Sequence, residues 1–274
     1  MGGADPRREL FIALPVTRTL LMPSNLFSPP LQGKNAVVTG GSSGIGAAAV
    51  RLLASEGARV VIGFNQGAER AESLRASLPG EGHLVMHMPL TDAAAHAVLA
   101  SRLAVELGHI DILVNSAGYT QRIAHTDIDT LDSALFNEIL TANAGGTYSI
   151  TRALIPLLQN SGDATVVSVS SISAFTGSGS NLAYCAAKAA LDTMTMSLAR
   201  VFGPKVRFLC VSPGSVDTGF VPGRSSEEVQ KKGASSPIGR AVTAEDVARA
   251  VLACVTHLTT ATGTRIVIDG GQHL

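Results

Sequence analysis

The stretch KNAVVTGGSSGIG, residues 34–46, joins an apolar run to a glycine-rich turn and then to a helical pattern. Gly40 permits a tight turn, Gly44 removes a Cβ where a phosphate would approach the backbone, and Gly46 lets helix and strand pack closely. The N–H groups of the helix N-terminus would face a diphosphate. A Gly/Ser turn without a ligand is the alternative, because the spacing differs from GxGxxG. The candidate phosphate-binding residues are Gly40, Ser42, Ser43, Gly44, Ile45 and Gly46.

Apolar runs alternate with helical patterns along the rest of the chain. The runs are continuous, as in a parallel sheet that helices cover on both faces. We therefore expect one Rossmann-type, doubly wound α/β domain over residues 33–274, with a mostly seven-stranded parallel sheet. Strands are expected in KNAVVTG, ARVVIGF, HLVMHM, DILVN, ATVVSVSS, VRFLCVS and TRIVIDGG, and helices over residues 44–56, 66–78, 91–107, 131–159, 184–202 and 243–257. For the last helix, Thr243 is the expected N-cap and Asp246 completes a capping box.

Composition excludes several classes of protein. The 274 residues are 46% hydrophobic and 15% charged, which is typical of a folded domain rather than a disordered chain. The 21 basic and 21 acidic residues balance, so nucleic acid is not an expected partner. No apolar run approaches the ~18–20 residues of a membrane helix, so no membrane partner is expected.

The cysteines and the N-terminal residues bear on compartment and order. Cys185, Cys210 and Cys254 are far apart and form no CxxC pair, so we expect neither a disulfide nor a metal site. Reduced thiols favour the cytoplasm. Residues 1–32 carry five prolines and no clear period, which predicts a loosely ordered arm. Pro15 interrupts its apolar stretch, which argues against a secretory signal.

The second expected strand ends in GFNQG, without an acidic residue. An Asp or Glu at that place normally hydrogen-bonds the ribose 2′-hydroxyl of NAD. Its replacement by Phe64 and Asn65 removes the repulsion of a 2′-phosphate, to which Asn65, Ser42 and Arg70 can donate. The sequence thus favours NADP(H), with NAD(H) possible. The alternative is that Phe64 and Asn65 are ordinary turn residues.

Tyr184 and Lys188 share one face of an expected helix, because four residues make about one turn. A free phenol has a pKa of about 10, and a nearby ammonium group would lower that pKa into a range useful for acid–base catalysis. Ser171 ends the preceding strand, where its hydroxyl would face the ligand crevice and hydrogen-bond a substrate oxygen. The alternatives are an amphipathic helix with a snorkelling lysine, and a serine that caps backbone.

Taken together, these motifs make the chain resemble the short-chain dehydrogenase/reductase family, over roughly residues 33–274. The resemblance implies that Tyr184 acts as general acid in reduction, Lys188 bonds the nicotinamide ribose, and Ser171 polarises the carbonyl. It implies that Asn143 holds a water of a proton relay, with helix kinking or packing as the alternative. The motifs in chain order are TGGSSGIG from Thr39, NSAG from Asn115, NAGG from Asn143, Ser171, YCAAK from Tyr184, PGSVDTG from Pro213 and IDGG from Ile268.

The same resemblance places further residues at the cofactor. Asn115 and Ala117 would line the adenosine and ribose, and Val216 and Thr218 would contact the carboxamide and phosphates. The chain departs from the family at Pro89, where an acid commonly helps to fix adenine, so adenine binding is the least secure part of the resemblance. The complete set adds Leu90, Gly118, Pro213 and Gly214, beside Tyr184 and Lys188.

The expected activity is therefore NADP-dependent hydride transfer between nicotinamide and a small-molecule carbonyl or secondary alcohol, in a homotetramer. A 3-oxoacyl-thioester reductase is the leading subclass. Sugar, steroid or xenobiotic alcohol dehydrogenases are alternatives, and so is a regulator that binds NADP without catalysis. The substrate loop is expected near Asn181 and over residues 220–236, where Phe175, Phe220 and Val221 suggest a partly hydrophobic substrate.

Overall fold

The computed structural model describes Met1 and residues 29–274, and a parallel sheet of seven strands lies at its centre. The strand order is β3-β2-β1-β4-β5-β6-β7. Strands β1 to β3 are added toward one edge of the sheet and β4 to β7 toward the other, so the order of addition reverses between β1 and β4, which are direct neighbours. This confirms the doubly wound α/β fold. The strands are β1 Asn35–Thr39, β2 Arg59–Phe64, β3 Leu84–His87, β4 Ile112–Asn115, β5 Ala164–Val169, β6 Val206–Pro213 and β7 Thr264–Ile268.

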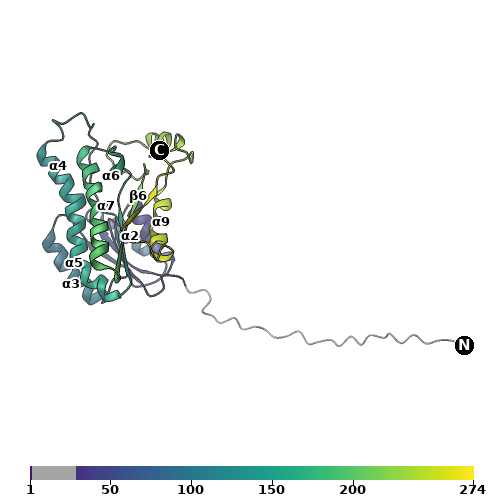
Figure 1. Ribbon diagram of the computed structural model, residues 1–274. Coiled ribbons are helices and arrows are strands. Elements are labelled where there is room, and N and C mark those ends of the chain that lie inside the picture. The colour runs from purple at the N-terminus through teal and green to yellow at the C-terminus, as the bar shows by residue number, and fades with distance from the viewer. Residues whose placement is uncertain (2–28) are drawn as a thin grey trace.

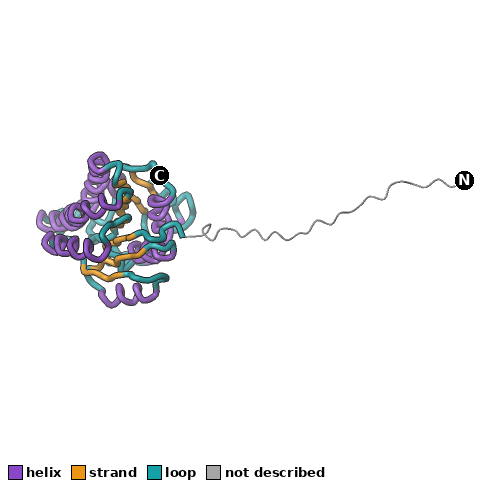
Figure 2. The backbone as a smooth tube through the Cα atoms, turned by 90° about the horizontal axis from the view of Figure 1, so that it is seen from below, coloured by secondary structure: helices purple, strands orange, loops and turns teal. Residues whose placement is uncertain are grey.

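Helices cover both faces of the sheet (Figures 1 and 2). One face carries α1 (Gly44–Ser55), α2 (Ala68–Ser77) and α9 (Ala244–Thr256), and the other carries α3 (Ala93–Leu107), α5 (Gly146–Ser161) and α7 (Leu182–Phe202). Three shorter helices complete the described fold. They are α4 (Ser133–Leu140), α6 (Ser173–Thr176) and α8 (Ser226–Ala234).

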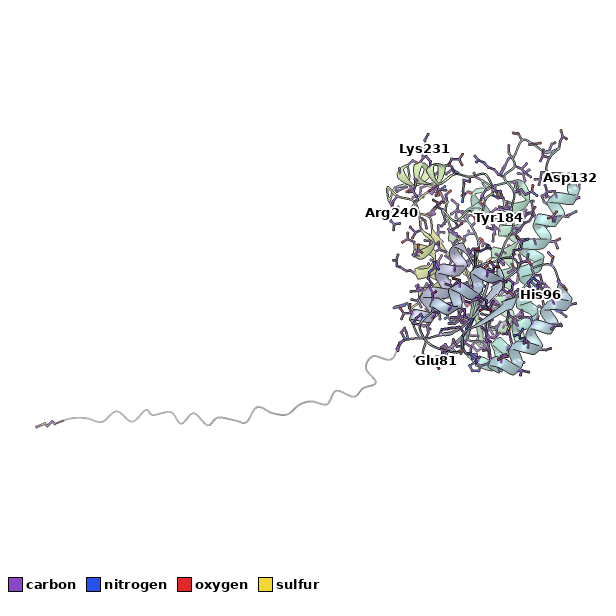
Figure 3. All side chains as sticks on the ribbon, turned by 180° about the vertical axis from the view of Figure 1, so that it is seen from behind. Glu81, His96, Asp132, Tyr184, Lys231 and Arg240 are labelled. Atoms are coloured by element: carbon purple, nitrogen blue, oxygen red, sulfur yellow. The ribbon has the colours of Figure 1, made fainter. Side chains whose placement is uncertain are left out.

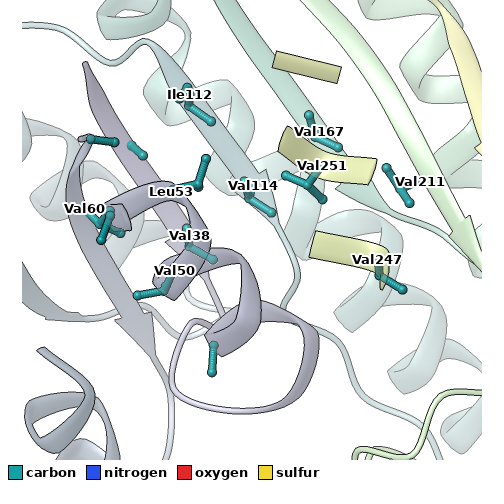
Figure 4. Close-up of a cluster of buried hydrophobic side chains, with 14 of the residues drawn as sticks. Val38, Val50, Leu53, Val60, Ile112, Val114, Val167, Val211, Val247 and Val251 are labelled. Atoms are coloured by element: carbon teal, nitrogen blue, oxygen red, sulfur yellow. The ribbon is translucent and has the colours of Figure 1, made fainter. Parts of the chain in front are cut away.

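Successive strand residues supply the two cores in turn. Val38 of β1 packs with Val50 and Val251 on the α1 and α9 side (Figure 4). Val37, its neighbour, packs with Leu103 on the α3 and α5 side. All of these side chains are 1% exposed or less, and burying each contributes about 1.5–3 kcal/mol. The continuous apolar runs of the sequence thus arise because both sheet faces are covered.

The predicted helix over residues 131–159 is interrupted, which corrects the sequence-based expectation. A π-helical turn, Thr141–Gly145, separates α4 from α5. Such turns insert an extra residue into a helix and commonly occur at functional sites. Asn143 lies within this turn. Its position therefore agrees with the alternative interpretation, in which Asn143 marks an irregularity of the helix.

Two more expectations need correction. The sequence predicts a loop over residues 220–236, but this segment contains α8, which begins at a capping box formed by Ser225 and Glu228. The arm was expected over residues 1–32, yet Leu31 is 3% exposed and belongs to the core. Residues 2–28 lie outside the described part of the chain, so the expectation of a loosely ordered arm over these residues stays a prediction. The capping box of Thr243 and Asp246 is confirmed.

Within residues 29–274, no helix has the length and apolar character that crossing a bilayer requires. The three cysteines are free and buried.

Candidate active site

A cleft of about 1580 Å³ opens at the carboxyl ends of the strands, where the strand order reverses. Open α/β sheets bind their ligands at this place. Residues that follow β1, β4, β5 and β6 line it together with one face of α7. Most of the predicted site residues line the cleft. They are Ser171, Lys188, Gly40, Ser42, Ser43, Gly44, Ile45, Asn65, Leu90, Ala117, Gly118, Tyr184, Pro213, Gly214, Val216 and Thr218.

The glycine turn has the backbone that its sequence predicts. Gly40 and Gly44 have φ values of +63° and +52°, in the left-handed region that favours glycine. A Cβ on Gly40 would lie 2.8 Å from Ala117 Cα, so the turn fits tightly against the β4 loop. Gly46 does not line the cleft; a Cβ there would strike the carbonyl of Gly40, so this glycine packs the helix on the turn rather than on the strand.

The N-terminus of α1 faces the cleft with its first N–H groups uncapped. Ser43 is the N-cap residue, but its side chain makes no cap hydrogen bond. The first turn of a helix leaves backbone donors without partners and carries partial positive charge. Gly44 and Ile45 follow directly and line the cleft. This arrangement fits an anionic group such as a diphosphate.

Beyond β2, Asn65, Gln66 and Arg70 line one end of the cleft together with Ser42. No acidic side chain from this segment joins them in the described lining. Phe64 is not part of the lining: its ring lies 5.5 Å from that of His87 and packs on the core. The structure therefore separates Phe64 from the site that the sequence assigned to it.

Tyr184, Lys188 and Ser171 come together in the cleft. Asn181 caps α7 by accepting from the N–H of Tyr184 at 2.8 Å, so it fixes the helix start rather than touching substrate. The Nζ of Lys188 donates to the carbonyl of Val169 at 2.8 Å and lies 5.5 Å from the centre of the Tyr184 ring. Lys188 and Ser171 are 5% and 9% exposed, so both groups act in a sheltered environment.

Burial acts on the ionisation of both members of the pair. Burial raises the pKa of Tyr184 above its ordinary value, while Ser171 and Arg224 act to lower it. The amine of Lys188 donates to a backbone carbonyl rather than to the phenol oxygen. Burial also lowers the pKa of Lys188, to about 8. The effect of the Lys188 ammonium group on the pKa of the phenol stays a prediction.

Asn143 does not line the cleft, and its side chain is fully engaged. Its Nδ2 donates to the carbonyls of Tyr119 at 2.6 Å and Ile139 at 2.9 Å. Its Oδ1 accepts from the N–H of Tyr119 at 3.2 Å, and Thr147 donates to its carbonyl. The side chain holds the loop after β4. The water that the resemblance assigns to Asn143, as part of a proton relay, stays a prediction.

Asn115 is also turned away from the cleft. It is 4% exposed, and its Nδ2 donates to Thr151 at 3.0 Å and Ser168 at 3.3 Å beneath the sheet edge. This corrects the expectation that Asn115 lines the adenosine, whereas Ala117 beside it does line the cleft. At the adenine end, the carbonyl of Pro89 is hydrogen-bonded to His96 Nε2 at 2.6 Å, so the β3 loop is fixed without the missing acid.

The sequence reading missed two charged features of the cleft. Arg122 binds Glu228 through two hydrogen bonds, each of 3.0 Å, and so ties the β4 loop to α8. Arg224 lines the cleft near Tyr184. The spacing Ser225–Glu228 is the signal that would have found α8 and hence this side of the cleft.

Comparison with known proteins agrees with this geometry. A family model described as Enoyl-(Acyl carrier protein) reductase matches residues 40–273. The granaticin polyketide synthase putative ketoacyl reductase 2 of Streptomyces violaceoruber is 36% identical over 87% of this chain and 96% of its own. Cis-4-hydroxycyclohexanecarboxylate dehydrogenase of Sinomonas cyclohexanicum is 34% identical, over 86% and 95%. A putative short-chain dehydrogenase/reductase of Burkholderia xenovorans superposes with a TM-score of 0.80 at 30% identity, over 87% and 97%.

The chain belongs to the short-chain dehydrogenase/reductase family, a class of NAD(P)-dependent oxidoreductases that act on CH–OH groups.

Proposed function

We propose that this protein is an NADP-dependent reductase that converts a ketone or aldehyde into an alcohol, with 3-oxoacyl thioesters as the leading substrate class. The observation that carries the proposal is the meeting of Ser171, Tyr184 and Lys188 in the same cleft as the uncapped start of α1. One end supplies a proton and hydrogen bonds, and the other fits a dinucleotide diphosphate.

The residues of the cleft fit a nicotinamide cofactor. The backbone donors at Gly44 and Ile45 would hold the diphosphate, and the remaining donors of Lys188 would bind the nicotinamide ribose. When bound, the nicotinamide supplies the hydride. Val216 and Thr218 line the cleft from the loop after β6, opposite the glycine turn, where a Cβ on Gly44 would lie 3.2 Å from Thr218.

The chain's own groups would stabilise the oxygen of the reacting carbonyl. Negative charge develops on this oxygen as the carbon accepts hydride. Ser171 donates a hydrogen bond to it, and Tyr184 donates a hydrogen bond and then the proton. The raised pKa of Tyr184 keeps the phenol protonated at neutral pH, which is the form that reduction requires.

The preference for NADP rests on the lining after β2. Asn65, Ser42 and Arg70 offer hydrogen-bond donors at this end of the cleft, and Arg70 adds positive charge. The thioester class is supported by the named ketoacyl reductase relative, while the named hydroxycyclohexanecarboxylate dehydrogenase keeps a cyclic alcohol as the alternative.

A variant tests the acid–base assignment. Tyr184→Phe removes the proton donor and keeps the ring, so reduction of acetoacetyl-CoA should fall by on the order of 10²–10⁴-fold. NADPH binding, followed by fluorescence, should change less than threefold. Arg70→Ala is the matched test of the cofactor, and it should weaken NADPH binding about tenfold while leaving NADH binding unchanged. Turnover that survives in Tyr184→Phe would overturn the proposal.

We also propose a cytoplasmic homotetramer. The free, buried cysteines suit a reducing compartment. Tyr148 on α5 and Met196 and Val201 on α7 are exposed apolar side chains, at 48%, 46% and 70%. Helices that present such side chains are suited to subunit contacts.

A further inference from the structure

The loop after β6 brings a cation into the cleft beside the reacting groups. Phe220 of this loop lies 5.9 Å from Tyr184, ring centre to ring centre. Arg224 follows it by four residues, is half-buried and also lines the cleft. Lys231, on α8, lies toward the same end of the molecule (Figure 3).

Arg224 is held in place with most of its donors free. Its Nη2 donates to the carbonyl of Val216 at 3.0 Å, and its backbone N–H donates to Val221. A guanidinium has five N–H donors in a planar fork that matches a carboxylate or a phosphate. Within residues 29–274, no other hydrogen bond from this guanidinium is formed. The side chain is therefore oriented by the loop but is not consumed by it.

The neighbouring carboxylates of Asp217 and Glu228 attract Arg224 without forming a salt bridge to it. Asp217 accepts from the hydroxyl of Ser226, and Glu228 is bound by both terminal nitrogens of Arg122. Among the described residues, no salt bridge involves Arg224. These two carboxylates offset part of the cost of burying the cation, and an anionic ligand in direct contact with the guanidinium would offset more of it.

The cleft as a whole has the same sign. Of the described residues that line it, only Glu138 and Glu228 are acidic. The basic residues of the lining are Arg70, Arg122, Lys188, Arg224, Lys231 and Lys232. A cleft that is lined mainly by positively charged side chains raises the local concentration of anionic ligands. Arg70 lies at the far end, after β2, so it cannot serve the substrate end.

We propose that Arg224 binds an anionic group on the substrate, so that this enzyme acts on carbonyl compounds and alcohols that carry a carboxylate or a phosphate a short distance from the reacting carbon. This inference rests on the proposed function, because it places the substrate's carbonyl at Tyr184. Arg224 is then a specificity-determining residue. The carboxylate of a small oxo acid meets this requirement directly, and the phosphate of a pantetheine thioester, which shares the anionic chemistry, meets it when the pantetheine chain folds back toward Arg224.

Two matched pairs of probes separate these sources. The first pair is 4-oxocyclohexanecarboxylate and its neutral carboxamide. The second pair is acetoacetyl-CoA and the phosphate-free N-acetylcysteamine thioester of acetoacetate. The value of kcat/KM is measured for each probe with wild type, Arg224→Gln, Arg224→Lys and Arg249→Gln. Arg249 on α9 is a matched control, because it is 69% exposed, lies outside the cleft lining, and leaves Asp246 paired with Arg240.

We expect Arg224→Gln to lower kcat/KM by about 10- to 100-fold for the anionic member of one pair, and by less than about threefold for its neutral partner. The loss should appear mainly in KM. Arg224→Lys should recover part of it, and Arg249→Gln should match wild type for all probes. NADPH binding should be unchanged in Arg224→Gln, and its thermal unfolding should show that the variant folds.

Calorimetric binding of the same probes to the NADPH complex tests the inference without turnover. Weaker binding of an anionic probe to Arg224→Gln supports it even if wild type reduces none of the four, a result that would instead overturn the proposed function. Equal effects of Arg224→Gln on the charged and neutral members would overturn the inference alone. A loss of NADPH affinity in Arg224→Gln would also overturn it, by assigning the guanidinium to the cofactor.

Discussion

At the scale of single residues, the buried lysine is the most unusual group of the site. Lys188 is 5% exposed, and its Nζ is hydrogen-bonded to a backbone carbonyl rather than to an acid. Asp192, one turn further along α7, is instead paired with Arg265 at 2.9 Å. Burial therefore lowers the pKa of Lys188 to about 8, so the amine can exchange its proton near neutral pH.

This lowered pKa predicts how stability changes with pH. Between pH 8 and about 10.5 the unfolded chain keeps the lysine proton while the folded chain has lost it, so the free energy of unfolding rises with pH. From pH 8 to 9.5, wild type should gain about 1.5 kcal/mol relative to Lys188→Met. Urea unfolding of both proteins at each pH measures this difference. Parallel pH profiles would contradict the burial of a titrating amine.

At the scale of elements, the π-helical turn between α4 and α5 organises the rim of the cleft. It brings Asn143 against the loop after β4, where the amide hydrogen-bonds both the N–H and the carbonyl of Tyr119. A Cβ on Gly118 would lie 2.9 Å from Asn143 Oδ1, so the loop passes close to the turn. Asn143 is thus a positioning residue that acts through the loop backbone.

Asn143→Ala should loosen this loop. Loss of the amide leaves the carbonyls of Tyr119 and Ile139 without their donor, which costs about 1–3 kcal/mol. Hydrogen exchange at residues 118–123 should become faster, and the thermal midpoint should fall. Asn143→Asp is the control, because its carboxylate still accepts from Tyr119 N–H but donates to neither carbonyl. Unchanged exchange in Asn143→Ala would assign the residue to another role.

Local sequence patterns predict the elements better than they predict their breaks. The seven strands follow from continuous apolar runs, because a sheet covered on both faces needs apolar side chains at every position. The π-helical turn leaves no such trace, since one extra residue shifts the helical pattern only slightly. Asn115 and Phe64 lie at the expected strand ends, but the direction of a single side chain depends on tertiary packing.

At the scale of the whole molecule, α7, which lines the cleft, and its neighbour α5 also present apolar side chains outward. Tyr148, Met196 and Val201 lie on α5 and α7, whose inner faces pack on the sheet. Tyr184 and Lys188 project from α7 as well. A subunit contact on these helices would therefore support the site from behind.

Sedimentation velocity should show a tetramer of the 28.1 kDa chain. Met196→Glu combined with Val201→Glu should dissociate it, because burying two carboxylates in an apolar contact is costly. Val98→Glu on α3, where the side chain is 70% exposed, is the control and should leave the assembly intact. A wild-type monomer at micromolar concentration would remove this proposal.

We propose above that this cleft transfers a hydride and a proton to one carbonyl group. The most direct measurement is mass spectrometry of the alcohol formed from acetoacetyl-CoA with NADPH deuterated at either face of nicotinamide C4. With one of the two labels, wild type should place a single deuterium on the carbinol carbon, and Tyr184→Phe should form almost no labelled alcohol. Unlabelled alcohol from wild type with both labels, or equal labelled product from Tyr184→Phe, would contradict the account.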